Sequence, residues 1–167
     1  MKRLVLIRGP IFAGKTTIAG LLRERLGEAS KIDFDELKLQ IDDTKSSLWR
    51  QELALKTSLF LTRELTKFDR TIIVDIHSSK ENQYREYQKV AAQNGYFLFS
   101  FLLRPPLEVC LARSRVRDDS NLKYKISEEK ITEYWRDTFH IEGEMEFDTS
   151  KLTPEKTVSG IMAVIGS

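Results

Sequence analysis

Cysteine is almost absent from this chain of 167 residues, which has a single one, Cys110, in the apolar context LEVCLARSR. One thiol forms neither an internal disulfide nor a cysteine zinc site, so both kinds of covalent or metal cross-link are excluded. The apolar neighbours predict that Cys110 is a buried core residue. A chain without disulfides is expected in a reducing compartment, and we expect the cytoplasm.

Long hydrophobic runs are also missing. No stretch approaches the roughly 20 apolar residues of a membrane-spanning helix, and the opening MKRLVLI is interrupted by Arg8, too early for a secretory signal. We therefore expect no membrane partner. Repeats, low-complexity tracts and linkers are not visible either, and 41% hydrophobic content suits one core, so residues 1–167 are predicted to form a single domain.

The chain also lacks a large net charge of either sign. The formal net charge is +2 and the sequence pI is about 8.6, which gives a field too weak to argue for nucleic acid or a membrane surface. Nucleic acid is therefore not favoured as a partner, and any basic site must be local.

The apolar residues that are present alternate between two periods. Short continuous runs predict strands covered on both faces at 4–7, 71–76 and 96–103, with weaker ones at 31–34 and 145–148. Helical patterns separate them, at 15–26, 46–68, 80–94, 106–116, 127–139 and 154–164. This alternation predicts a three-layer α/β domain with a mainly parallel five-stranded sheet and helices on both faces. Ligands of such sheets bind at the carboxyl ends of the strands.

A phosphate-binding motif follows the first of these runs. Gly9 to Thr16 read GPIFAGKT, which satisfies G-x-x-x-x-G-K-[ST] between a predicted strand and a predicted helix. Loop amides and the helix N-terminus attract phosphate oxygens. We expect Gly14 to allow close backbone approach, Lys15 to span the β- and γ-phosphates and Thr16 to ligate Mg²⁺. The expected nucleotide-binding residues are Gly9, Pro10, Ile11, Phe12, Ala13, Gly14, Lys15, Thr16 and Thr17.

Phe12 is unusual, because many such loops have glycine at this point and a side chain restricts the turn. The wording GPxFxGK is similar to the phosphate loop of the type II thymidine kinases, which indicates that phenylalanine is tolerated there. The similarity is confined to this loop.

Features of nucleotide hydrolases are missing. The chain has no N-K-x-D guanine motif, and Asp75 at the end of its strand is followed by Ile76 and not by glutamate. Without a group that polarises water, transfer of a phosphoryl group to a bound hydroxyl is favoured over coupled hydrolysis.

Two carboxylates follow the second predicted strand. Asp33 and Asp35 are two residues apart, so they point the same way if the chain is still extended. We expect Asp35 to accept the proton of an acceptor hydroxyl, with Asp33 nearby and Lys38 as an anion anchor on the substrate side. The alternative is an N-cap carboxylate that opens a helix at ELKLQI, and both roles can hold together.

Arginines gather after the fourth strand. Arg113 and Arg117 share one helix face at i,i+4, with Arg104 and Arg115 close in sequence. Clustered guanidinium groups suit a lid that neutralises a transferring phosphoryl group, and we place this short mobile lid at about 118–126. The alternative is a solvated basic helix end paired with Asp118 and Asp119.

Taken together, GPIFAGKTT, DFDELK, TIIVDIHS, CLARSRVR and FDTSKLTPEKTV resemble the small P-loop kinases related to the kinase half of polynucleotide kinase, which include gluconate-type and antibiotic-modifying phosphotransferases. The resemblance implies the P-loop NTPase fold, with ATP and Mg²⁺ as cofactors. It also implies Asp35 as catalytic base, Arg113 and Arg117 as transition-state clamps, and a loop at 148–152, with Thr149, near the adenine.

The chain departs from that family at two acceptor positions. Relatives often have D-x-T-N after the third strand, where this chain has Asp75, Ile76, His77 and Ser78, and Lys38 stands where arginine is common. We expect Asp75 to organise Mg²⁺ or to hold the acceptor. His77 either faces the acceptor or is a hydrogen-bonded loop residue.

These observations predict an ATP-dependent kinase that transfers the γ-phosphoryl group to a hydroxyl of a small molecule or nucleoside. The expected catalytic residues are Lys15, Asp35, Arg113 and Arg117, and the expected acceptor residues are Asp33, Asp35, Lys38, Asp75 and His77. Two alternatives stay open: a polynucleotide 5′-hydroxyl kinase, and a protein that binds ATP as a sensor without transferring phosphate.

Overall fold

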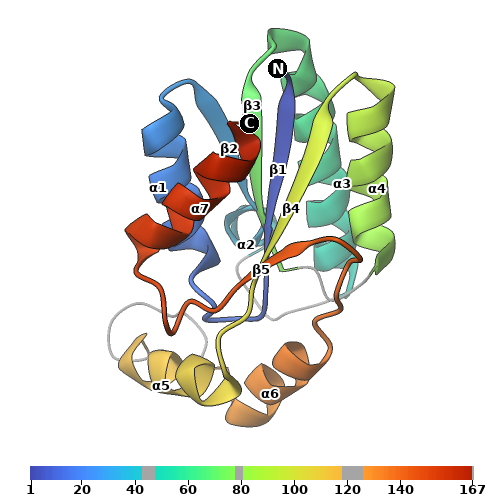
Figure 1. Ribbon diagram of the computed structural model, residues 1–167. Helices are drawn as coiled ribbons and strands as arrows, with labels where there is room; N and C mark the ends of the chain where they lie inside the picture. Colours follow the sequence, from blue (N-terminus) through green and yellow to red (C-terminus); the bar gives the residue numbers. More distant parts are fainter. Residues whose placement is uncertain (43–47, 78–80, 118–125, 167) are drawn as a thin grey trace.

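The computed structural model describes residues 1–42, 48–77, 81–117 and 126–166 (Figure 1). Most of the expected lid, 118–126, lies outside the described residues. Within them the sheet has five strands in the order β2-β3-β1-β4-β5, and every pair is parallel. The strands are β1 (Arg3–Arg8), β2 (Ala29–Asp33), β3 (Thr71–Ile76), β4 (Phe97–Leu103) and β5 (Met145–Phe147). The predicted parallel sheet is thus confirmed.

Helices cover both faces of the sheet. In Figure 1, α1 and α7 lie on one face, α3 and α4 lie on the other, and α5 and α6 lie beyond the carboxyl ends of the strands. The helices are α1 (Lys15–Leu26), α2 (Phe34–Ile41), α3 (Leu48–Leu65), α4 (Glu81–Gln93), α5 (Leu107–Arg117), α6 (Glu128–Arg136) and α7 (Pro154–Ile165). None of these helices is both long and apolar enough to span a lipid bilayer.

Two helix ends differ from the sequence prediction. The pattern over 127–139 predicts a longer helix than α6, which ends at Arg136. The carbonyl group of Phe139 is turned away from helical pairing and accepts a hydrogen bond from Arg8 Nη2 at 3.0 Å. The long pattern at 46–68 becomes α3 and a short 3₁₀ turn, Thr66–Phe68.

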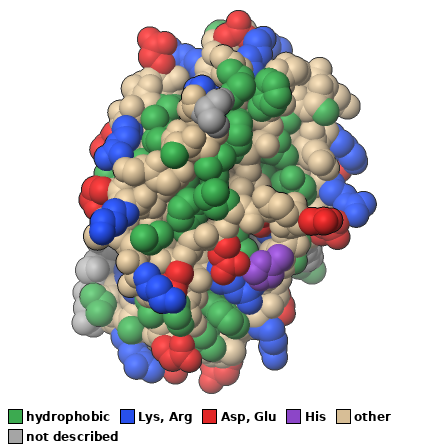
Figure 2. All heavy atoms as spheres, in the orientation of Figure 1, with side chains coloured by type: hydrophobic (Ala, Val, Ile, Leu, Met, Phe, Trp, Pro, Cys, Tyr) green, Lys and Arg blue, Asp and Glu red, His purple; other side chains and the backbone are tan. Residues whose placement is uncertain are grey.

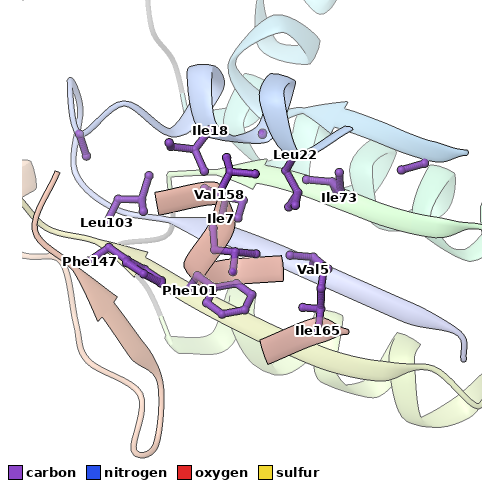
Figure 3. Packing of buried hydrophobic residues seen from close by; sticks show 14 residues of the cluster. Val5, Ile7, Ile18, Leu22, Ile73, Phe101, Leu103, Phe147, Val158 and Ile165 are labelled. Atoms are coloured by element: carbon purple, nitrogen blue, oxygen red, sulfur yellow. The ribbon is translucent and has the colours of Figure 1, made fainter. Parts of the chain in front are cut away.

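The core consists of two layers separated by the sheet. Val5 and Ile7 of β1 face α1 and α7, whereas Leu4 and Leu6 face α3 and α4. Figure 3 shows the first layer, in which Ile18 of α1 and Val158 of α7 pack over the strands. Because both faces of β1 are buried, its sequence is a continuous apolar run and does not alternate.

Charges of both signs are spread over the face of the molecule drawn in Figure 2. On the face shown in Figure 2, lysine and arginine side chains are interspersed with aspartate and glutamate, and no continuous basic track crosses it. This distribution agrees with the small net charge of +2.

Two helical glycines provide a test of the packing. A Cβ atom on Gly20 of α1 would have no neighbour within 4 Å, so Gly20→Ala is expected to raise the free energy of unfolding by about 0.5–1 kcal/mol. A Cβ atom on Gly160 of α7 would lie 2.8 Å from Cε1 of Phe147. Gly160→Ala is therefore expected to lower the free energy of unfolding by about 1–3 kcal/mol, the usual cost of an overpacked site. Urea unfolding of both variants measures the difference, and equal stabilisation would contradict this packing.

Candidate active site

The phosphate loop joins β1 to α1, and its two glycines have different tasks. Gly9 has φ 148°, and a Cβ atom there would lie 2.2 Å from the carbonyl oxygen of Leu103 in β4. Gly14 has φ 96° and precedes α1 in a left-handed conformation. Gly9 thus permits a close approach within the protein, whereas the expected approach of Gly14 to a phosphate stays a prediction.

The side chain of Phe12 is buried against α5 and α6. Its backbone has φ 64°, which is strained for a residue with a side chain, and the side chain is only 8% exposed. The side chain packs with Cys110 of α5 and Ile131 of α6. This packing holds the left-handed turn, so the loop keeps its shape without a glycine at this position. The expectation that Cys110 is a buried core residue is also confirmed.

Lys15, Thr16 and Asp75 converge at the start of α1. The buried Nζ of Lys15 donates to the carbonyl oxygen of Pro10 at 3.0 Å, across the loop. The hydroxyl of Thr16 donates to Oδ2 of Asp75 at 2.6 Å, because strand pairing places Asp75 beside Ile7. Burial raises the pKa of Asp75 to about 6, against the opposing charge of Lys15 and the hydrogen bond from Thr16.

This hydroxyl and carboxylate fit a magnesium ion. Mg²⁺ in nucleotide sites is held by one or two protein oxygens, with phosphate oxygens and water completing an octahedron. Thr16 and Asp75 supply two such oxygens beside the phosphate loop. Elsewhere in the described part of the chain, histidine, cysteine and carboxylate side chains do not gather in groups of three or more that suit a metal.

Asp33 and Asp35 are arranged differently from the extended pair that their spacing predicts. The strand ends at Asp33 and α2 begins at Phe34, so the expectation of two carboxylates on one extended chain is wrong. Oδ1 of Asp33 accepts hydrogen bonds from the amides of Asp35 and Glu36, both at 3.1 Å. An N-cap carboxylate is therefore present, as the alternative interpretation expects, but it is Asp33 and the helix begins at Phe34 rather than at Glu36. Because the carboxylate of Asp33 binds the first free amides of α2, the chain turns into the helix here and the strand ends.

Asp35 projects from the first turn of α2 beside two lysines. Its carboxylate lies 2.5 Å from Nζ of Lys38, and 56% of its side chain is exposed. Burial of the surrounding cleft disfavours the charge, but Lys38 and Lys15 outweigh it and lower the pKa of Asp35 to about 2. The carboxylate is therefore ionised at neutral pH and can accept a hydrogen bond from a hydroxyl group.

His77 follows β3 and lies against α6. Its ring meets the ring of Tyr134 edge to face, with 4.4 Å between the centroids. Both ring nitrogens are shielded from solvent, and neither has a hydrogen-bond partner among the described residues. The alternative of a hydrogen-bonded loop histidine is thus not observed there. Burial and the charge of Lys15 lower the pKa of His77 to about 3, so the imidazole is neutral at physiological pH.

Arg113 connects α5 to both walls of a cleft. Nη1 donates to the carbonyl oxygen of Phe12 at 3.2 Å and to Oγ1 of Thr149 at 3.0 Å, and Nη2 donates to the carbonyl oxygen of Thr149 at 2.7 Å. The hydroxyl of Thr149 in turn donates to the carbonyl oxygen of Ala13 at 2.9 Å. The loop after β5 is therefore fixed to the phosphate loop through one guanidinium and one hydroxyl.

The cleft beside this contact has a volume of about 400 Å³, which suits a nucleoside. Arg117 lies one turn beyond Arg113 and also lines it. The alternative pairing with Asp118 and Asp119 lies outside the described residues. The other two arginines of this region have separate partners, because Arg115 binds Glu128 and Arg104 stacks on Trp135 at 4.5 Å. The cleft is lined by Phe12, Ala13, Gly14, Thr17, Ile18, Arg113, Arg117, Thr149, Leu152, Pro154 and Thr157.

Arg8 is the residue that sequence reasoning overlooks. It ends β1 directly before the phosphate loop, is 0% exposed, and forms an ion pair with Glu144 through Nη1, at 2.9 and 2.7 Å from the two carboxylate oxygens. Its guanidinium also stacks on the ring of Phe139 at 4.2 Å. Arginine is almost never fully buried unless it is paired. The sequence does contain a signal for this pairing, because Arg8 directly follows the apolar run 4–7, which is predicted to be a buried strand.

Comparison with known proteins establishes the fold. No protein-family model and no curated protein sequence matches the chain. Among solved structures, a tunicamycin resistance protein from Deinococcus radiodurans is 21% identical with a TM-score of 0.74, over 99% of this chain and 96% of that one. The APS kinase CysC from Mycobacterium tuberculosis is 16% identical with a TM-score of 0.75, over 99% and 98%. A gluconokinase from Sinorhizobium meliloti is 12% identical with a TM-score of 0.71, over 98% and 95%.

These similarities cover whole chains at low identity, so they show a shared fold. The expected P-loop fold, and the resemblance to small P-loop kinases, are confirmed at that level. The roles of individual site residues stay predictions.

The raised pKa of Asp75 predicts how stability depends on pH without ligands. Its folded value of about 6 lies above the ordinary 3.8, so the folded chain binds a proton that the unfolded chain lacks between these values. The stability from this group therefore falls as pH rises from about 4 to 6. Asp75→Asn is expected to raise the free energy of unfolding by about 1–3 kcal/mol near neutral pH and to change it little near pH 4.

Urea unfolding at several pH values measures this difference. Glu52→Gln, an exposed change on α3, is the matched control and is expected to follow the wild-type profile. A difference between Asp75→Asn and wild type that stays constant with pH would contradict the assignment.

Proposed function

We propose that the protein is an ATP- and Mg²⁺-dependent kinase that transfers the γ-phosphoryl group to a hydroxyl of a small molecule or nucleoside. One observation carries the proposal. Thr16, next to Lys15, is hydrogen-bonded to Asp75, and the strand register places Asp75 beside Asp33. Asp35 follows in the first turn of α2, so the candidate cation, magnesium ligand and base lie at one edge of the sheet.

The nucleotide side of the site is supported by the loop and the cleft. The amides after Gly9 and the N-terminus of α1 attract the phosphates. Lys15, bonded to the carbonyl oxygen of Pro10, would exchange this bond for the β- and γ-phosphates. The cleft beside Thr149 would hold the nucleoside of ATP.

Thr16 and Asp75 would hold the magnesium ion, which supplies charge neutralisation on the phosphates. Asp75 ligates in its ionised form, and its pKa of about 6 makes the carboxylate mostly ionised at neutral pH even before a cation arrives. The short hydrogen bond between them keeps the hydroxyl oxygen of Thr16 and the carboxylate of Asp75 side by side, where both would face the ion.

On the acceptor side, Asp35 would orient the attacking hydroxyl and take its proton late in the reaction. A pKa of about 2 makes Asp35 a weak base. Phosphoryl transfer through a loose transition state requires little early proton removal, so orientation is its larger contribution. Lys15 and Arg113 would stabilise charge on the transferring group, and Arg117 would assist when α5 approaches the phosphates.

Two substitutions test the chemistry. Lys15→Ala is expected to lower kcat at least about 1,000-fold, because charge on the transferring group loses its nearest cation. Asp35→Asn is expected to lower kcat by about 100- to 10,000-fold with little change in ATP affinity. Glu36→Gln changes the adjacent exposed carboxylate in the same way and is the matched control.

The assay is transfer of labelled γ-phosphate over sugars, nucleosides and single-stranded oligonucleotides. Equal activity of Asp35→Asn and wild type would remove the base from this scheme. Slow hydrolysis with every acceptor, insensitive to Asp35, would instead favour an ATP-binding sensor. Transfer confined to oligonucleotides, with affinity that falls steeply with salt, would favour the polynucleotide kinase alternative.

A further inference from the structure

Phe12 has a left-handed backbone, with φ 64°, although it carries a side chain. A residue with a Cβ atom avoids this conformation, which glycine adopts without steric cost. Among the described residues other than glycine, only Phe12 and Asp69 have a positive φ, and Asp69 is an exposed residue before β3. Strained residues persist where the surrounding structure enforces them. The fold must therefore hold Phe12 in this conformation.

The ring of Phe12 provides this hold. It packs with Cys110 of α5 and Ile131 of α6, which are both fully buried, and the side chain of Phe12 itself is 8% exposed. A change of the backbone to the right-handed conformation would move the ring out of this cluster. Because a buried phenylalanine side chain contributes strongly to stability, its packing opposes that change.

The same backbone conformation directs the carbonyl group of Phe12 toward Arg113. The direction of a carbonyl group is set by φ and ψ, the two soft angles of its residue. The carbonyl oxygen of Phe12 accepts a hydrogen bond from Nη1 of Arg113 at 3.2 Å. Nη1 would also lie 4.0 Å from a Cβ atom on Gly14, so the guanidinium lies against the loop. Cys110 and Arg113 are three residues apart on α5, so the ring and the carbonyl group of Phe12 contact the same helix face.

The contacts of Arg113 leave one edge of its guanidinium without a partner. Arginine has five N–H groups in a fixed plane. Nη1 donates to Phe12 and to Oγ1 of Thr149, and Nη2 donates to the carbonyl oxygen of Thr149. Because Nη1 and Nη2 bind Thr149 side by side, the N–H of Nε and the second N–H of Nη2 remain together on another edge. Neither has a partner among the described residues, and such a pair suits two oxygens of one phosphoryl group.

We infer that, within the proposed kinase reaction, Phe12 is a positioning residue for Arg113. The ring packs on α5 and α6 and enforces the left-handed backbone. The carbonyl group that this backbone directs holds the guanidinium, with one edge available to the transferring phosphoryl group. Only this last step rests on the proposed function, because the contact between Phe12 and Arg113 exists without a substrate.

Two pairs of variants separate the backbone of Phe12 from its packing. Phe12→Ala and Phe12→Gly both remove the ring, but only glycine adopts the left-handed conformation freely. The penalty on a Cβ atom there corresponds to about a tenfold difference in population, so kcat of Phe12→Ala is expected to be about tenfold below that of Phe12→Gly. Phe12→Leu and Phe12→Ile have equal volume, and the β-branched isoleucine is expected to have the lower kcat.

Transfer of labelled γ-phosphate measures these differences, at a temperature where thermal unfolding shows that each variant is folded. The effect is expected in kcat more than in KM for ATP, because Arg113 acts on the transferring group. A ring that only stabilises the fold would give equal kcat values within each pair, and that result would overturn the inference. The leucine and isoleucine pair decides the question if Phe12→Ala does not fold.

The route through Arg113 is tested by repeating the alanine and glycine pair in an Arg113→Lys background. A lysine side chain has one ammonium group in place of the planar guanidinium. The difference between Phe12→Ala and Phe12→Gly is therefore expected to fall below about twofold in this background. Persistence of the full difference would overturn the inference.

Nitrogen NMR signals of the arginine side chains give a readout that does not depend on the reaction. The signals that disappear in Arg113→Lys identify Arg113. In the protein without nucleotide, Phe12→Ala is expected to shift or broaden the Nη1 signal more than Phe12→Gly, because Nη1 loses the carbonyl group of Phe12. An Nη1 signal that is unchanged in Phe12→Ala would overturn the inference. If the wild type transfers phosphate to no acceptor, the proposed function fails, and the NMR comparison still decides whether Phe12 holds Arg113.

Discussion

The approach of Gly9 to the carbonyl oxygen of Leu103 is the contact on which the site depends. It brings the start of the phosphate loop against the end of β4, at a distance that only a residue without Cβ permits. From there the chain turns through Phe12, whose side chain is fixed by Cys110 and Ile131, and enters α1 at Gly14. The loop is thus shaped by backbone contact on one side and by side-chain packing on the other.

Charge around this loop is balanced locally. Lys15 is the common neighbour of Asp35, Asp75 and His77, and its influence differs for each. It helps to hold the pKa of Asp35 at about 2, limits the rise that burial causes at Asp75, and adds to the desolvation that keeps His77 neutral. Arrival of a polyphosphate beside Lys15 would change all three environments at once, because their charges are coupled over short distances in a poorly hydrated cleft.

The sequence predicted the sheet, the phosphate loop and the shared helix face of Arg113 and Arg117, because each depends on local pattern: continuous apolar runs, a fixed glycine and lysine spacing, and an i,i+4 repeat. It was wrong where two local rules compete, since Asp33 continues a strand by spacing but caps a helix by chemistry. It missed the pair of Arg8 and Glu144, which are 136 residues apart and meet only when β4 and β5 are in place. Such contacts depend on topology, and no short window of sequence contains both partners.

Thr149 has a consequence for the order of events in the site. Its hydroxyl joins the loop after β5 to Ala13, and its carbonyl group and hydroxyl both receive the guanidinium of Arg113. One wall of the cleft, Arg113 and the phosphate loop are therefore joined as one mechanical unit. In the proposed kinase, a displacement of α5 would widen the cleft and withdraw the guanidinium in the same movement, so release of the spent nucleotide and loss of charge stabilisation would be a single step.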